Sequence, residues 1–456
     1  MNRSWSNSVF PIAAIFSFRM LGLFMLIPVF TIFATELQGA TPALIGLALG
    51  SYGLSQGILQ MPFGMLSDRF GRKPILTIGL VIFALGSLLG AHSHSIYMMI
   101  FARTLQGTGA IGSVLIALLA DLTLDEQRTQ AMAVIGMTIG LSFGLAMVIS
   151  PALTSSYGLA GIFYLSTFLA LVGLVLLHTL ISTPKKECFH LDSEANPSLF
   201  KDVIRNKHLQ RLNAGIFLQH FILTATFFII PILLQEQIKL SNLTQQWHFY
   251  LPLMLFSFVL MIPFIIMAEK KRRMKSVFLM SVVLTCLSQW LLAWVGHHWL
   301  SLCALMFFYF TAFNILEATL PSLVSKQAPL ASKGTAMGVY SSCQFLGIFA
   351  GGSTAGLLYQ FSGSTGIFIC NGILSLLWLI LALAMKPEAY FSTLIISYTQ
   401  PLINKMDLIS GLKTLKGVKD AVIGQEEELI YLRIDKRNYL FGSAEKILNE
   451  QDLKSI

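Results

Sequence analysis

The feature that most limits the possible folds of this chain is a succession of long apolar segments separated by short polar ones. Each segment is long enough to cross the hydrocarbon layer of a bilayer as a helix. Twelve of them occur, at about residues 8–35, 42–65, 75–92, 96–119, 130–152, 160–182, 209–235, 246–268, 276–296, 299–324, 334–358 and 366–385. They lack the alternation of a transmembrane barrel strand, and backbone amides in lipid must be satisfied within the segment. The sequence therefore predicts an all-α polytopic membrane protein.

The composition agrees with a protein whose solvent is largely lipid. Charged residues make up 12% of the 456 residues, whereas soluble chains contain about 25%. The net charge of +9 is carried by the membrane part, so it indicates orientation and anionic lipid rather than nucleic-acid binding. The five cysteines have neither metal nor disulfide spacing, and no loop shows a nucleophile–base pair. We therefore expect no metal, no cofactor and no enzymatic activity.

A polar stretch divides the apolar segments into two groups of six. This predicts an N-terminal six-helix bundle over residues 1–182, a cytoplasmic linker over 183–208 and a C-terminal six-helix bundle over 209–386. One alternate set of loops carries nearly all the lysines and arginines, and the other carries Lys239 alone. The positive-inside rule then predicts a multi-pass inner-membrane protein with both termini in the cytoplasm.

Two stretches of the sequence repeat each other. The residues from Asp121 to Val134 align with those from Lys326 to Val339 at a constant offset. The offset is about 205 residues, which places both copies at equivalent points of the two groups. We interpret this as duplication of one six-helix unit.

The composition changes after Lys386. Three segments then read as strands and two as helices, in the order strand, helix, strand, strand, helix, at residues 391–397, 402–415, 418–423, 429–434 and 442–450. This order predicts a small α+β, ferredoxin-like cytoplasmic module over residues 387–456, with its last strand partial or absent.

Between the second and third apolar segments lies a charged loop with glycines, Gly64-Met-Leu-Ser-Asp68-Arg69-Phe-Gly71-Arg72-Lys73. Its pattern resembles the signature loop of the major facilitator superfamily of secondary transporters. That resemblance implies twelve transmembrane helices in two six-helix bundles, as the internal repeat also suggests. Together with the tail, the chain is similar over nearly its whole length to the YajR-type proton-coupled drug efflux subfamily. The residues that carry this similarity are Arg19 to Phe24, Gly136 to Gly140, Gly417 to Lys419 and Tyr431 to Asp435.

The same resemblance implies a conformational latch. Asp68 is expected to face the cytoplasmic start of the eleventh span, where a carboxylate is stabilised by the helix dipole. Arg72 is expected to pair with Asp121 at the end of the fourth span. The latch would hold the two halves in an outward-open state, and its members are Gly64, Asp68, Arg69, Gly71, Arg72, Lys73 and Asp121. A simple positive-inside anchor is the alternative, and it accounts for Arg69 and Lys73 but not for Asp68.

Charged residues deep in the apolar segments are the candidates for proton coupling. Glu317 is the only acidic one, and a carboxyl group at this depth usually faces a cavity, a partner or a proton. Asn314, one turn earlier, is expected to share its face and to orient it. A structural acid paired with an arginine is the alternative for Glu317.

Arg19 and Arg103 are the only lysines or arginines deep within spans. The stretch from Arg103 through Gln106 to Gly109 resembles the second motif of the superfamily, whose arginine is associated with proton coupling. The resemblance implies that Arg103 tunes a nearby carboxylate, and Arg19 is a further candidate. For both arginines a structural anchor between spans is the alternative.

Polar and aromatic residues within the spans are the candidates for a substrate cavity. They are Arg19, Gln106, His220, Phe221, Phe313 and Asn314, and ordinary helix packing is the alternative for each aromatic ring. Gly136, Gly140 and Gly144 also predict a smooth, closely packed helix face. We expect a monomeric, proton-coupled antiporter that exports a small amphipathic molecule by alternating access. A symporter or uniporter for a nutrient or metabolite is one alternative, and a membrane sensor that uses the tail module is another.

Overall fold

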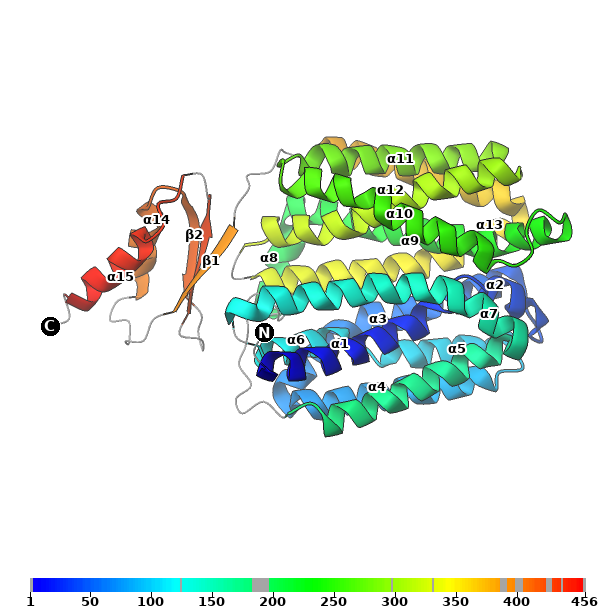
Figure 1. Cartoon of the computed structure of the whole chain (residues 1–456), viewed down its shortest axis with the longest axis horizontal. Coiled ribbons are helices and arrows are strands. Elements are labelled where there is room, and N and C mark those ends of the chain that lie inside the picture. The colour runs from blue at the N-terminus through cyan, green and yellow to red at the C-terminus, as the bar shows by residue number, and fades with distance from the viewer. Residues whose placement is uncertain are drawn as a thin grey trace.

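The computed structural model describes residues 3–123, 125–182, 197–296, 298–329, 332–385, 392–397, 405–423, 429–435 and 438–453. Residues 183–196 of the predicted linker and the first residues of the predicted tail therefore lie outside the described part. The chain forms a large helical region with a small α+β module at one end (Figure 1).

The helices fall into two groups that lie side by side (Figure 1). The first group contains α1 (Arg3–Phe24), α2 (Phe30–Phe33), η1 (Ala34–Glu36), α3 (Pro42–Phe70), α4 (Arg72–Ala91), α5 (Ile96–Thr108), α6 (Gly112–Asp121) and α7 (Asp125–Thr179). The second contains η2 (Pro197–Leu199), α8 (Phe200–Arg205), α9 (Lys207–Lys239), α10 (Trp247–Glu269), α11 (Met274–Val295), α12 (Trp299–Gln327) and α13 (Lys333–Leu383). Their apolar character gives the predicted all-α membrane fold.

Two of these helices are too long for one crossing. Among the described residues, nine helices are long and apolar enough to span a membrane, and a single crossing needs only about 20 residues. The 55-residue α7 and the 51-residue α13 are each broken at a glycine with positive φ, Gly158 (+61°) and Gly363 (+62°). Each helix reverses direction at its break (Figure 1). The two breaks are related by the sequence offset of about 205 residues, as expected for a duplicated unit. The exact number of twelve crossings stays a prediction.

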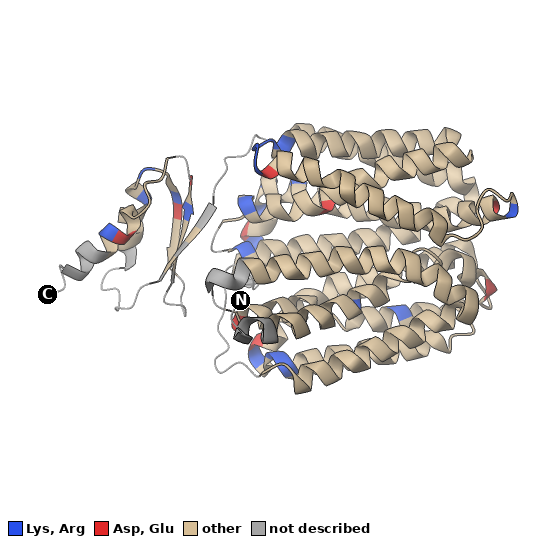
Figure 2. Cartoon of the chain, in the orientation of Figure 1, with Lys and Arg blue, Asp and Glu red and all other residues tan. Residues whose placement is uncertain are grey.

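The charges follow the predicted asymmetry. Figure 2 shows lysines and arginines gathered at the end of the helical region that faces the tail module, with few at the opposite end. Such a distribution is typical of a cytoplasmic face on the side of the tail. We therefore call the end near the tail the inner end and the other the outer end.

The two halves touch through backbone along α3 and α13. A Cβ atom added at Gly46 would lie 2.3 Å from the carbonyl oxygen of Gly352, and one at Gly50 would lie 2.6 Å from that of Phe349. Only glycine permits so close an approach, because any side chain would overlap the facing helix. The prediction of close packing at Gly136 was wrong, since an added Cβ there would meet nothing within 4 Å. An added Cβ at Gly140 or Gly144 would make ordinary contact with the ring of Phe258, so this helix face meets a side chain rather than another backbone.

The tail has the predicted order of elements. They are β1 (Ser392–Ser397), α14 (Lys405–Thr414), β2 (Val418–Ile423), β3 (Leu429–Ile434) and α15 (Ser443–Leu453). The strands form an antiparallel sheet in the order β1-β3-β2, in which Leu432 of β3 lies opposite both Leu394 and Ala421. Leu408, Leu432 and Leu448 belong to its separate apolar core. Within the described residues the sheet has three strands, and their order and antiparallel pairing agree with the ferredoxin-like arrangement.

The tail contacts the inner end of α12 through the sheet face that α14 and α15 leave free (Figure 1). The guanidinium of Arg433 on β3 donates to the backbone carbonyls of Lys326 and of Ala328, the latter at 3.3 Å. Carbonyl groups in the last turn of a helix have no partner within the helix. Arg433 therefore caps the helix that carries Glu317, nearly three turns away.

Candidate functional site

The signature stretch is helical rather than a loop, which corrects the sequence prediction. Residues up to Phe70 extend α3, Gly71 alone separates the helices, and Arg72 begins α4. The residues from Met65 to Phe70 include neither proline nor glycine, so the helix continues into its charged end. Gly71 has φ +93° and ψ 151°, a conformation that favours glycine. This sharp turn brings Arg72 back over the last turn of α3.

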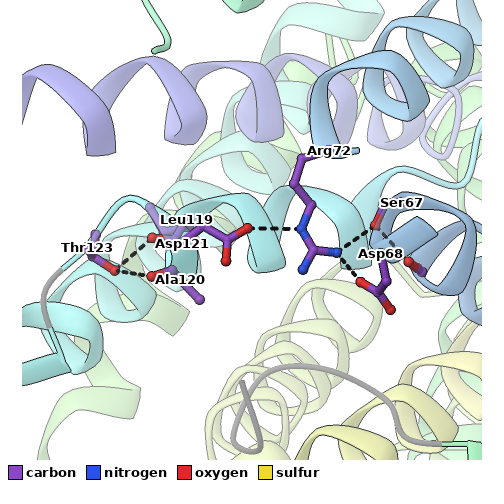
Figure 3. Close-up of polar contacts among 8 residues, drawn as sticks. Ser67, Asp68, Arg72, Leu119, Ala120, Asp121 and Thr123 are labelled. Atoms are coloured by element: carbon purple, nitrogen blue, oxygen red, sulfur yellow. Dashed lines mark hydrogen bonds and ion pairs between the residues drawn. The ribbon is translucent and has the colours of Figure 1, made fainter. Parts of the chain in front are cut away.

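Arg72 lies at the centre of a cluster of polar side chains (Figure 3). Its Nε donates to Asp121 Oδ2 at 3.0 Å, as predicted, and its Nη1 donates to Ser67 Oγ at 2.8 Å and to Asp68 Oδ1. The side chains of Arg72 and Asp121 are 2% and 0% exposed, whereas Asp68 is 35% exposed. Thr123 Oγ1 closes the end of α6 beside Asp121 by donating to the Leu119 carbonyl. A buried cation between two carboxylates is a stable electrostatic arrangement only if the donors are satisfied.

The other members of the predicted latch lie at its edge. Arg69 is exposed, with its guanidinium 5.3 Å from the ring centre of Phe70. Lys73 donates to the carbonyl of Ile181 beyond α7, and a Cβ at Gly64 would make only ordinary contact with Ser113. The contacts given above join α3, α4 and α6 of the N-terminal half. The seating of Asp68 against the start of α13, which would link the two halves, stays a prediction.

Glu317 lies in a polar site of the C-terminal half. Its carboxylate accepts from Gln219 Nε2 of α9 at 3.0 Å and from Gln344 Nε2 of α13 at 3.4 Å. His220 Nε2 lies 3.8 Å from Glu317 Oε2 and accepts from Gln344 Nε2 at 2.8 Å. Its Nδ1 then faces the Ile216 carbonyl at 3.3 Å, which fits a neutral ring. The Glu317 side chain remains 34% exposed, so protein atoms do not cover it completely.

The contacts of Glu317 contradict one expectation and do not support the alternative of an arginine pair. Asn314 does not orient it, because the Asn314 amide instead donates to Ser257 Oγ of α10 at 3.1 Å. One turn of helix puts the two side chains near each other, but the polar partner on α10 draws Asn314 aside. Contacts of Glu317 in the described part are with two amides and an imidazole rather than with an arginine. Such partners leave a carboxyl group free to exchange a proton, whereas an ion pair with a guanidinium would hold it ionised.

Arg19 and Arg103 flank one tyrosine in the N-terminal half. Arg19 Nη2 donates to the Tyr52 hydroxyl at 3.1 Å and to Gln56 Oε1. The Arg103 guanidinium lies over the Tyr52 ring, 4.9 Å from its centre, and Arg103 Nη1 donates to Gln106 Oε1 at 2.7 Å. Both guanidiniums are buried, at 3% and 2% exposure. The two arginines predicted separately from the sequence therefore form one cationic cluster.

The predicted cavity residues do not form a single surface. Gln106 is fully buried, accepts from Arg103 and donates to Ser87. It therefore holds Arg103 in place and does not line a cavity. Phe221 packs by its backbone against Gly351 of α13. Phe313 is 6.0 Å from His220 and 6.0 Å from Phe143, measured between ring centres. Of the aromatic candidates, Phe313 is the one beside the Glu317 site.

A chain of amides that the sequence analysis missed extends from Arg19 to the other half. Gln56 Nε2 donates to Gln60 at 3.0 Å, and Gln60 Nε2 donates to Ser341 Oγ of α13 at 2.8 Å. Ser341 lies one turn before Gln344, which contacts Glu317. The available signal was the spacing of four residues between Gln56 and Gln60, which places two amides on one face of an apolar helix.

Comparison with known proteins gives a consistent result. The profile of the Major Facilitator Superfamily matches residues 12–351 and, in a second alignment, 212–405. The inner membrane transport protein YajR of Escherichia coli K12 is 40% identical over 93% of this chain and 93% of its own length. The class H tetracycline resistance protein of Pasteurella multocida is 25% identical over 85% of this chain and 96% of its own. The crystal structure of the nucleoside transporter NupG superposes with a TM-score of 0.64 at 17% identity, over 82% of this chain and 98% of that protein.

Proposed function

Because this chain belongs to the major facilitator superfamily of membrane transporters, we propose that it exports small amphipathic molecules across the inner membrane in exchange for protons. The family consists of transporters rather than enzymes, and the relationship to YajR supports a multi-pass inner-membrane protein. Export is supported by a relative whose name is a tetracycline resistance protein, since removal of a drug from the cell is a direct route to resistance. Both termini lie in the cytoplasm in this proposal, and the protein acts as a monomer.

The observation that carries the proton-coupled part is the environment of Glu317. A carboxyl group within the membrane region is costly when ionised and unpaired. Glu317 has amide donors from α9 and α13, keeps 34% exposure and has His220 Nε2 at 3.8 Å. Amides stabilise either protonation state through hydrogen bonds, and the exposed part gives water access for proton exchange. Arg103 is separated from this site in the fold, so in this proposal it acts within the N-terminal half.

Transport in proteoliposomes tests this function. An internal pH dye would report proton movement when members of a panel of lipophilic cations, amphipathic anions and neutral metabolites are added. Glu317→Gln keeps the shape and removes the exchangeable proton, so we expect it to abolish transport driven by a pH gradient. Glu269→Gln is the matched control, because Glu269 pairs with Lys326 at 2.8 Å at the exposed inner end of α10. Unchanged pH-driven transport by Glu317→Gln would rule out the assigned role.

A further inference from the structure

Among the described residues, the cationic cluster of the N-terminal half has no carboxylate partner. Arg19 and Arg103 are both buried, and the polar partners described for them are a tyrosine and two glutamines. Asp68 and Asp121, the carboxylates described at the inner end of this half, contact Arg72. A buried guanidinium without an anion is costly in a membrane protein. Such a cation usually marks the place where a negative charge arrives.

In the part of the chain that the structure describes, some donors of Arg19 also have no acceptor. Its Nε and Nη1 are buried without a hydrogen-bond partner, as is Nε of Arg103. Leaving a buried charged donor unsatisfied costs more than a hydrogen bond gains. Arg19 Nη2 already donates to Tyr52 and Gln56. We therefore interpret the N–H groups on Nε and Nη1 as donors for a ligand.

A glycine, Gly112, lies directly against these donors. A Cβ atom placed at Gly112 would have two neighbours within 4 Å, Arg19 Nη1 at 3.4 Å and Gln60 Nε2 at 4.0 Å. Both are nitrogen donors, one cationic and one neutral. A point approached by a guanidinium and an amide suits a planar oxyanion, since carboxylates take paired N–H donors from arginine.

Aromatic rings follow further along α1 and on the neighbouring helices α7 and α12. Phe24 lies on α1 beyond Arg19, and its ring centre is 5.1 Å from that of Phe143 on α7. Phe143 in turn lies 6.0 Å from Phe313 of α12. The polar point and the aromatic surface are therefore arranged in sequence from the Gly112 level toward the outer end. A molecule with an acidic head and an apolar body matches this arrangement.

We propose that Arg19 and Gln60, which meet at Gly112, form the binding subsite for the carboxylate group of an amphipathic organic anion. The inference deepens the proposed function by naming the substrate class, and it rests on that function only in treating the centre of the protein as the transport path. Arg19 contacts the substrate here, whereas Glu317 in the other half handles the proton. An anion and an exchangeable carboxyl group are thereby kept on different bundles.

Equilibrium binding to the full-length protein in nanodiscs tests the proposal without a pH gradient. Indole-3-acetate and uncharged indole-3-acetamide have the same shape, so their difference in Kd measures recognition of the charge. A charge-assisted pair predicts a preference for the acetate of about tenfold or more. Arg19→Gln should abolish that preference, and Arg19→Lys should retain part of it, because the charge stays and the planar donor pair is lost. Arg211→Gln is the control, since Arg211 caps the Ala384 carbonyl at 2.8 Å far from this site.

Several results would overturn the inference. They are equal affinity of the wild type for acetate and acetamide, binding of neither, and a preference that persists in both Arg19 variants. Competition by chloride without a carboxylate preference would assign the site to inorganic anions and reject the substrate class. Failure of the proposed function looks different, because carboxylate binding through Arg19 would persist while pH-driven transport is absent. Monodisperse elution of Arg19→Lys shows that a loss of binding is not a loss of folding.

Discussion

Gly46→Ala should open the contact between the two halves at their outer end. The added methyl group would lie 2.3 Å from the Gly352 carbonyl oxygen and 2.8 Å from Cα of Gly356, both on the backbone of α13. Ordinary van der Waals contact begins at 3.4 Å, so the helices must move apart by about 1 Å or accept the overlap. Overpacking of this kind costs about 1–3 kcal/mol. A two-state equilibrium would therefore shift about 5- to 150-fold away from the closed arrangement.

The same substitution is favourable in an isolated helix, where alanine is preferred over glycine by about 1 kcal/mol. A shift toward the open form would thus reflect the contact and not a weakened α3. Spin labels at Gln38 and Gln360, both exposed, report the separation of the outer ends by pulsed electron resonance in a background without native cysteines. Gly136→Ala is the matched control, because its methyl group would meet nothing within 4 Å. The reasoning fails if Gly46→Ala and Gly136→Ala give the same distance distribution as the parent protein.

Two further changes test the inner end. Asp121→Asn removes one carboxylate from buried Arg72 while Asp68 remains, so the free energy of unfolding should fall by about 1–3 kcal/mol. A lowered thermal midpoint is the expected readout, exposed Arg69→Gln should change it little, and equal midpoints would show that the pair is not stabilising. Arg433→Ala removes the cap on α12 and should speed deuterium exchange in the tail strands, whereas exposed Lys419→Ala should not. Exchange that is the same in both variants would show that Arg433 does not hold the tail.

Length and periodicity were sufficient to predict the helices and the tail, because both depend on local rules. A bilayer sets the length of an apolar helix, and alternation with turn residues defines the short strands of the tail. Glycine spacing did not predict close helix packing, because packing depends on which helix lies opposite in the fold. The glycine spacing from Gly136 to Gly144 looks like that of Gly46 and Gly50, yet only the latter faces another backbone. Sequence spacing identifies a smooth helix face but not the neighbour that uses it.

The site shows the same division. Glu317, Arg19 and Arg103 were found because a charge is conspicuous in an apolar segment. The partners of Glu317 were missed, because Gln219 and Gln344 are neutral residues on other helices, brought together only by the fold. Such amides carry no signal in a single sequence beyond being polar. The C-terminal end of α3 was predicted wrongly for a different reason. Its charged residues were interpreted as a loop, although such residues also suit the end of a helix.

Polar contacts of α13 connect the separation of the two halves at the outer end with the surroundings of Arg19 and Glu317. Ser341 and Gln344 lie one turn apart on α13, and they contact Gln60 of α3 and Glu317 of α12 respectively. The glycines that touch α3 lie on the same helix, further toward the outer end. Any separation of α13 from α3 that relieves the glycine contacts also stretches the 2.8 Å bond from Gln60 to Ser341. Because Gln60 borders the space beside Arg19, the surroundings of the cation change in the same step. A single helix, α13, thus contacts both sites, which is the physical connection that the proposed exchange of an anion for a proton would require.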